Sequence, residues 1–203
     1  TVVTGHQLNL FTGPLYFVYK ILSTIKLAGI LKERYPNHHF VPVYWMGTED
    51  HDFEEVNHFN FRGKEIRWNR PYGGAVGRMN TQGLKAVFEK FSADLGPGSR
   101  ADTLRQLFQQ AYLGHNNMAE ATRYLVNELF GHLGLVILDS DDARLKSLFA
   151  PHIENDLFGQ LGYRKVSESI ERLNALPGNY RIQVSPRELN FFYLTEGFRS
   201  RLV

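Results

Sequence analysis

Three carboxylates and an imidazole stand side by side directly after an apolar run of the sequence: Glu49, Asp50, His51 and Asp52. Crowded carboxylates raise one another's proton affinity, and an imidazole takes up or releases a proton near neutral pH. Such a group suits general acid–base catalysis or the binding of an ammonium group. These four residues are the predicted catalytic set. A solvated N-terminal turn of a helix, where acidic residues are also favoured, remains the alternative.

A second polar stretch, residues 4–14, combines glycines with hydrogen-bonding side chains. Glycines allow a ligand to approach the backbone, and a helix that begins near Pro14 would offer unpaired N–H groups to an anion. The stretch lacks the GxGxxG and GxxxxGK[ST] spacings, so neither nucleotide motif is assigned, and a plain turn is the alternative. The residues predicted to bind substrate or nucleotide are Thr4, Gly5, His6, Gln7, Gly13, Tyr16 and Lys20.

A third candidate, Asp139, follows a short apolar run and precedes Ser140, Asp141 and Asp142. Its carboxylate is suited to a ribose hydroxyl or a substrate amine, although helix capping explains the acidic group nearly as well. No metal ligands are predicted, because neither HExxH nor a similar fixed spacing occurs. The oxygen and nitrogen ligands of the acidic stretch still leave a metal-dependent hydrolase open as an alternative.

The elements that must position these residues follow from the hydrophobic pattern. The β-branched start, residues 1–3, predicts a strand, and apolar residues at helical spacing after Pro14 predict an amphipathic helix. The nearly continuous apolar run 40–46 predicts a strand covered on both faces. A β-α-β unit of this kind places both loops at one sheet edge. Asp52 and Glu55 have the spacing of a capping pair, which predicts a helical turn over 53–56.

The remainder predicts an α/β fold with a doubly wound parallel sheet and a mostly helical insertion. Helices are expected over about 83–94, 102–113 and 118–133, followed by a buried strand over 135–138 and short strands near 180–184 and 191–194. The predicted division is residues 1–70 for the first part of the core, 71–133 for the insertion and 134–203 for the return to the core.

Composition limits the classes of partner. Hydrophobic residues make up 43% of the 203 residues and charged residues 22%, which is typical of a globular protein. The net charge is +2 with scattered basic residues, so neither a nucleic acid nor a membrane partner is predicted. No apolar stretch approaches the roughly 20 residues of a membrane span. The absence of cysteine fits a cytoplasmic location. Both ends lie in strand-like runs, so we expect a piece of a longer protein.

Two strings of residues together resemble the BshC family. The first joins Thr4-Gly5-His6-Gln7 to Leu10-Phe11-Thr12-Gly13-Pro14 and Lys20, and the second joins Val41-Pro42-Val43-Tyr44-Trp45-Met46-Gly47 to the acidic residues 49–52. Gln183-Val184-Ser185-Pro186-Arg187-Glu188 extends the resemblance over essentially the whole chain. It departs at His6, where the family often has Gln.

The resemblance implies a cysteine ligase of bacillithiol synthesis, which joins cysteine to glucosaminyl-malate through an amide bond. It implies a Rossmann-like core similar to nucleotidyltransferases and class I aminoacyl-tRNA synthetases, and a homodimer formed through a coiled-coil region absent from this chain. Activation of the cysteine carboxylate by ATP is an expectation from fold analogy, and no other cofactor is expected. The alternatives are the metal-dependent hydrolase and a nucleotide- or anion-binding module without turnover.

Overall fold

The computed structural model describes residues 1–202. It divides into two compact units, one of residues 1–141 with 195–198 and the other of residues 142–194 with those after 198. Every predicted site residue lies in the first unit. The three-part division expected from the sequence stays a prediction.

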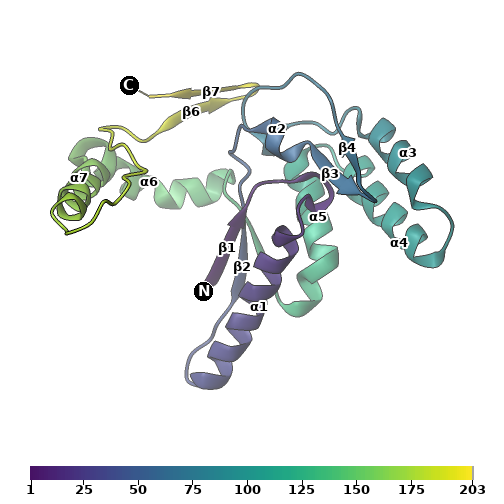
Figure 1. Cartoon of the computed structure of the whole chain (residues 1–203), viewed down its shortest axis with the longest axis horizontal. Coiled ribbons are helices and arrows are strands. Elements are labelled where there is room, and N and C mark those ends of the chain that lie inside the picture. The colour runs from purple at the N-terminus through teal and green to yellow at the C-terminus, as the bar shows by residue number, and fades with distance from the viewer. Residues whose placement is uncertain (203) are drawn as a thin grey trace. The chain divides into compact units, whose positions relative to one another are not determined.

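A three-stranded parallel sheet forms the base of the first unit, with the order β1-β2-β5. Its strands are β1 (Val2–His6), β2 (Pro42–Met46) and β5 (Val136–Asp139). Helix α1 (Tyr16–Arg34) connects β1 to β2, and Figure 1 shows it lying alongside both strands. The β-α-β unit and the α/β class with a parallel sheet are therefore confirmed.

Helix α1 covers one face of this sheet. Its apolar residues recur every three or four positions, so one stripe of the helix turns inward and buries Phe17, Ile21, Thr24 and Ala28. The Phe17 ring meets the ring of Tyr44 edge-on, with 5.5 Å between centroids. Pro14 lies just before the N-cap residue Leu15 and not in the first turn as expected, and its carbonyl accepts the N–H of Phe17 at 3.0 Å.

The opposite face of the sheet is partly exposed. Trp45 is 46% exposed, Val3 52% and Val136 48%, and the strand register places all three on that face. The expectation that the run 40–46 is covered on both faces is therefore wrong at Trp45. The apolar composition of the run reflects the burial of its neighbours Tyr44 and Met46 against α1.

Between β2 and β5 the chain forms a hairpin and a group of helices, and Figure 1 shows the hairpin beyond the carboxyl ends of β1 and β2. The hairpin turns at Arg62 and Gly63, both with positive φ. The helical middle predicted from the sequence is confirmed. The elements are α2 (Phe53–Val56), β3 (His58–Phe61), β4 (Lys64–Arg67), η2 (Val76–Arg78), α3 (Leu84–Leu95), α4 (Ser99–Phe108), the π turn η3 (Gln109–Leu113), α5 (Met118–Phe130) and η4 (Gly131–Leu133).

Phe11, in the short helix η1 (Leu10–Thr12), joins the sheet to the insertion. Its ring lies 5.7 Å from that of Phe59, 5.1 Å from Phe91 and 5.2 Å from Phe108, measured between centroids. The buried residues on both sides belong to one continuous core. The first loop is thus anchored in the insertion by an aromatic cluster, a strong form of apolar packing.

The second unit contains α6 (Ala143–Gly159), α7 (Leu161–Asn174) and the paired strands β6 (Phe192–Thr195) and β7 (Phe198–Arg201). The strand predicted near 191–194 corresponds to β6. The strand predicted near 180–184 is wrong, because a strand needs a partner for its backbone groups and this stretch pairs with no described segment. None of the helices within residues 1–202 has the length and apolar character needed to cross a bilayer.

Candidate functional site

The carboxyl ends of the three strands lie in line. His6 is paired with Met46, and Met46 with Asp139, so the loops after these strands leave from one edge of the sheet. Gly47 N–H donates to the carbonyl of His6 at 2.8 Å, which ties the first two loops together at their start. The prediction that the first loop and the acidic loop share a sheet edge is confirmed. In open α/β sheets this edge is where ligands bind.

A single side-chain amide bridges the two loops. The Nε2 atom of Gln7 donates to Oδ2 of Asp50 at 2.8 Å and to Oε2 of Glu55 at 2.7 Å. Both amide hydrogens are therefore directed at carboxylates. Asp52 begins α2 without a side-chain bond to the helix, so the predicted capping pair is wrong. Glu55 turns toward Gln7 instead of back toward the start of its own helix.

Asp50 accepts hydrogen bonds from several directions. Its Oδ1 accepts the backbone N–H groups of His51 at 2.7 Å and Asp52 at 3.2 Å. Burial raises the pKa of Asp50, but these bonds and the one from Gln7 outweigh it, so the pKa lies below its usual value. A carboxylate stabilised in this way stays ionised and is a weak proton acceptor. Its Oδ1 also lies 3.5 Å from Nδ1 of His51, so it can orient that ring.

The four predicted catalytic residues interact with different parts of the structure. Asp50 faces the first loop through Gln7. Glu49 acts on Arg78: the pKa of Arg78 is raised first by its hydrogen bonds to Asp141, and the charge of Glu49 adds to that rise. The side chain of His51 is 58% exposed, and Asp52 is half-buried. His51 is therefore the most exposed of the four side chains.

Thr48 fixes the acidic loop to the end of β5. This fully buried side chain donates to Oδ1 of Asp139 at 2.6 Å and lies 2.9 Å from the hydroxyl of Ser140. The Thr48 hydroxyl also accepts the N–H of Asp141 at 3.1 Å. Asp139 also accepts from Arg123 at 3.3 Å. The residue predicted to bind a ligand at β5 thus has both of its oxygens engaged by the protein.

The insertion holds the acidic loop from the other side. Val76 N–H donates to the carbonyl of Asp50 at 2.7 Å, and Gly77 N–H donates to that of Thr48 at 2.9 Å. A Cβ atom at position 77 would lie 2.6 Å from Cβ of Thr48, so only glycine fits. Arg78 then forms a two-point ion pair with Asp141, at 2.5 and 2.9 Å.

The first loop has an unusual backbone. Phe11, Thr12 and Gly13 all have positive φ, at 46°, 69° and 52°. Residues other than glycine rarely adopt this conformation, so the loop is held against local preference. Tyr112 contributes by accepting the N–H of Phe11 at 2.8 Å. A Cβ atom on Gly13 would lie 2.6 Å from Cβ of Asn9, which accounts for the glycine predicted to be important there.

His6 lies among aromatic rings, 5.1 Å from Tyr16 and 5.0 Å from Phe17 between centroids. Burial lowers its pKa, and the charge of Lys20 lowers it further against the opposing hydrogen bond to the Gln7 carbonyl. His6 is therefore a neutral imidazole near pH 7. Lys20 donates to the carbonyl of Gly5 at 2.6 Å, so its ammonium caps the end of β1.

Thr4 and Gly5 are ordinary members of β1. Thr4 is half-buried and paired with Tyr44, and Gly5 is paired with Trp45. A Cβ atom on Gly5 would meet the Trp45 carbonyl at 3.8 Å, an ordinary contact, so the glycine is not needed for space there. Both residues thus belong to the strand itself and not to the loop that follows it.

Two cavities lie at this sheet edge, and a third lies alongside β5. One of about 370 Å³ lies between the first loop and β3, and includes Gln7, Asn9, Tyr16, Glu55, His58 and Asn60 in its walls. A second, of about 280 Å³, lies at the end of β5 beside Thr48, Arg78, Arg123, Asp139 and Asp141. Long-range contacts create both cavities. The residues named here that were not predicted as site residues are Asn9, Glu55, His58, Asn60, Thr48, Arg78, Arg123 and Asp141.

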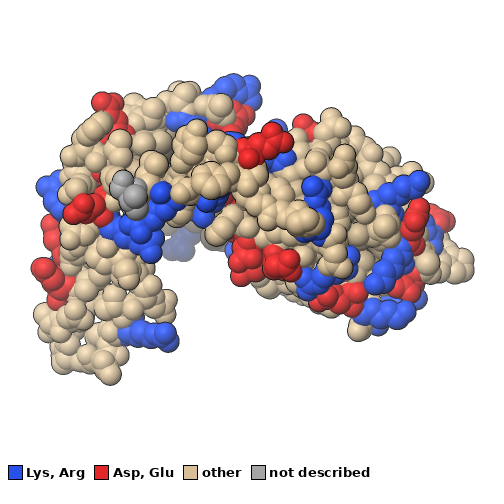
Figure 2. Space-filling view, turned by 90° about the horizontal axis from the view of Figure 1, so that it is seen from above, with Lys and Arg blue, Asp and Glu red and all other residues tan. Residues whose placement is uncertain are grey.

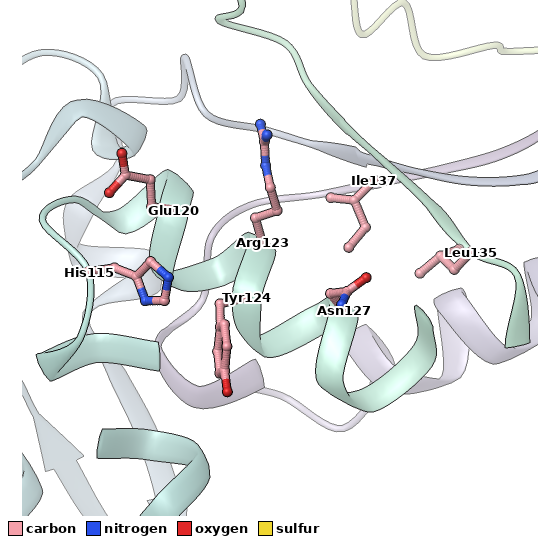
Figure 3. Close-up of a pocket in the computed structure, with 7 residues that line it drawn as sticks. All are labelled: His115, Glu120, Arg123, Tyr124, Asn127, Leu135 and Ile137. Atoms are coloured by element: carbon pink, nitrogen blue, oxygen red, sulfur yellow. The ribbon is translucent and has the colours of Figure 1, made fainter. Parts of the chain in front are cut away.

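The third cavity, of about 460 Å³, lies between α5 and β5. Figure 3 shows Asn127 facing Leu135 and Ile137, with the guanidinium of Arg123 directed away from the rings of His115 and Tyr124. Those two rings lie 5.0 Å apart. Nδ1 of His115 lies 3.0 Å from two backbone carbonyls, so it is a structural donor that closes the turn after η3.

Within residues 1–202, no three His, Asp or Glu side chains are arranged to hold a metal ion. Figure 2 shows acidic and basic side chains interspersed on the face in view.

Comparison with known proteins gives the family. The model of the domain described as "Bacillithiol biosynthesis BshC, N-terminal Rossmann-like domain" matches residues 1–203. The chain belongs to the BshC family. The Rossmann-like fold class predicted from the sequence is thereby confirmed.

Curated BshC relatives agree along the full chain. A protein of Flavobacterium johnsoniae named "Putative cysteine ligase BshC" is 53% identical over 203 residues, and relatives with the same name from Flavobacterium psychrophilum and Cytophaga hutchinsonii are 54% and 40% identical. Each alignment covers 100% of this chain, and 38%, 38% and 36% of the respective relatives. The chain thus spans well under half the length of the BshC proteins it matches.

Proposed function

We propose that the whole protein containing this chain is a cysteine ligase that joins cysteine to glucosaminyl-malate by an amide bond in bacillithiol synthesis. The names of the BshC relatives support the cysteine ligase activity and the pathway. The observation in this chain that carries the proposal is the bridge from Gln7 to Asp50 and Glu55. It joins the first loop and the acidic loop, where a carboxyl compound and an amine could meet.

Amide formation requires that the amine nitrogen attack the carboxyl carbon of cysteine, lose a proton and displace the activating group. We assign the proton acceptance to His51, because it is exposed and its ring lies beside the ionised carboxylate of Asp50. Asp50 is then a positioning group. Glu49 and Asp52 complete the negative surroundings that attract the amine. The neutral His6 and the hydroxyl of Tyr16 are proposed to contact the substrate.

The residues around Gly13 do not fit a polyphosphate. The walls of the cavity there include the carboxylate of Glu55 and neither lysine nor arginine, and Lys20 is bonded to Gly5. We therefore assign no step to ATP at the start of α1. Phosphate binding at a helix N-terminus needs unpaired N–H groups and a favourable charge, and the charge here is unfavourable.

Mass spectrometry of product tests the proposal. The whole protein is incubated with cysteine and glucosaminyl-malate, with and without ATP, and a species of their summed mass less one water is expected. Addition of a chelator selective for Zn²⁺ over Mg²⁺, with Mg²⁺ kept in excess, should leave its yield unchanged. Cleavage of an amide in place of its formation, abolished by the chelator, would instead support a metal-dependent hydrolase.

We also propose a cytoplasmic homodimer, with the dimer contact outside this chain. Size-exclusion chromatography with light scattering on the whole protein tests the assembly: twice the monomer mass is expected, and a single-chain mass would contradict it.

A further inference from the structure

The cavity between the first loop and β3 has a charge character that distinguishes it from its neighbour. Among the described residues that line this cavity, Glu55 is the one acidic residue, and none is a lysine or an arginine. The cavity at the end of β5 instead contains two arginines together with acidic residues. The first cavity is therefore suited to a cationic or neutral ligand and disfavours an anion.

Two carboxylates converge on one nitrogen beside this cavity. Asp50 and Glu55 each accept a hydrogen from Nε2 of Gln7. The amide satisfies hydrogen bonds but carries no charge, so it leaves the negative charge of both carboxylates in place. An ammonium group is the ligand group that would match both the hydrogen bonds and the charge.

A buried acceptor in the same wall also needs a donor. Asn9 is 4% exposed, and its Nδ2 donates to the backbone carbonyl of Glu55 at 3.2 Å. Its Oδ1 has no hydrogen-bond partner of regular geometry in the described chain, although Asn9 is close enough to His6 to raise the pKa of that ring. Buried acceptors are normally satisfied, so this oxygen points to a donor supplied from outside.

The rest of the wall offers neutral hydrogen-bonding groups, namely the amide of Asn60, the ring of His58 and the hydroxyl of Tyr16. Nδ1 of His58 lies 3.1 Å from Oδ1 of Asn57, which leaves the other ring nitrogen for a ligand. Such groups fit hydroxyls better than apolar surface.

We propose that this cavity binds the amine partner of the reaction, a primary amine on a compact hydroxylated molecule, with its ammonium held by Glu55 and Asp50. Asn60, His58 and Tyr16 receive its hydroxyl groups. The identity of this amine as a reactant rests on the proposed function, whereas the preference of the cavity for a hydroxylated amine does not.

Steady-state kinetics of the whole protein test the site in the reaction. Glu55→Gln removes the charge but keeps the shape, and we expect it to raise KM for glucosaminyl-malate by about tenfold while KM for cysteine changes by less than about twofold. Asn60→Ala should raise the same KM by a smaller factor. Glu54→Gln is the matched control, because Glu54 is the neighbouring residue of α2 and pairs with Arg67, with its side chain 78% exposed.

Calorimetry with simple probes decides the inference independently of turnover. Glucosamine should bind the wild type and Glu54→Gln equally, and Glu55→Gln about tenfold more weakly. N-acetylglucosamine, which lacks the charge, should bind all three weakly and alike. Equal glucosamine affinity in Glu55→Gln, no glucosamine binding by the wild type, or equal affinity for both probes would overturn the inference. A whole protein that binds glucosamine as expected but forms no amide would contradict the proposed function alone.

Discussion

The two ends of the carboxyl edge of the sheet neutralise their acidic groups in different ways. At the end of β5, Asp141 pairs with Arg78 at two points and Asp139 pairs with Arg123. At the ends of β1 and β2, Asp50 and Glu55 share the uncharged amide of Gln7. Both ends are well hydrogen-bonded. Only at the end of β5 is the negative charge matched by arginines.

We propose that this difference separates a supporting region at β5 from a binding region at the ends of β1 and β2. Charge-matched pairs at β5 hold the chain in place and leave little net field for a ligand. The carboxylates beside Gln7 are ordered but retain their charge, which is the condition for attracting a cation. Asp139, predicted as a ligand-binding residue, is better suited to ordering Thr48, and we propose that role for it.

The largest effect on product formation is expected at the ends of β1 and β2, where the carboxylates keep their negative charge. Asp50→Asn combined with His51→Ala in the whole protein should reduce product formation by at least about 100-fold, because the proposed base and the group that orients it are both lost. The urea unfolding midpoint should stay close to that of the wild type, since neither side chain belongs to the core. A folded double variant with wild-type turnover would show that the acidic loop is only a helix start.

At the charge-matched end, substitution should affect stability first. Arg78→Ala removes the two-point partner of Asp141, whose side chain is 11% exposed. We expect a loss of about 1–2 kcal/mol in the free energy of unfolding, because solvent screening of the partly exposed Arg78 limits the loss. Arg144→Ala is the matched control, since that arginine also pairs with an aspartate but is 89% exposed. Equal urea midpoints for both variants would remove the distinction between the two ends.

Thr48 offers a test of the link between β5 and the acidic loop. Thr48→Val keeps the shape but removes the hydroxyl that contacts Asp139, Ser140 and Asp141, so a loss of about 1–3 kcal/mol in unfolding free energy is expected. Thr48→Ser keeps the hydroxyl and should be closer to the wild type in both urea midpoint and kcat. If the serine variant were as impaired as the valine variant, packing of the methyl group would be the main role.

The smallest effect is expected from the proton equilibrium of His6. Burial holds its pKa in the folded protein below the unfolded value of 6.5, so the unfolded chain binds more protons. The stability contribution is complete above the unfolded pKa and is lost as the pH falls below it. Wild type should therefore lose more unfolding free energy between pH 7.5 and 5.5 than His6→Gln. An identical loss in both proteins, measured by urea titration, would show that His6 does not titrate differently on unfolding.

The sequence predicts those parts of the fold that depend on local patterns. The helical stripe of α1 and the apolar runs of β1 and β2 are periodic signals, and the glycine-bearing and acidic loops are placed by the ends of those strands. The exposure of Trp45 was not predictable, because composition does not tell which face of a strand is covered.

The candidate site depends on partners that are distant in sequence. Asp50 was predicted but its partner Gln7 lies 43 residues away, and Arg78 reaches Asp141 across 63 residues. Glu55 was interpreted as a capping residue from its spacing to Asp52. The competing donor that draws it away, Gln7, belongs to another loop, so no local pattern reveals the choice.

The backbone bonds around the acidic loop have a consequence for motion. Gly47 is bonded to β1, Asp50 to Val76 and Thr48 to Gly77, so two stretches far apart in the sequence, β1 and residues 76–77, restrain the loop at three of its residues. A segment held in this way cannot act as a lid that swings shut on a substrate. We therefore expect it to present its groups in the same arrangement with and without a ligand. In hydrogen–deuterium exchange, the backbone amides of Gly47, Val76 and Gly77 should be among the most slowly exchanging amides at this sheet edge.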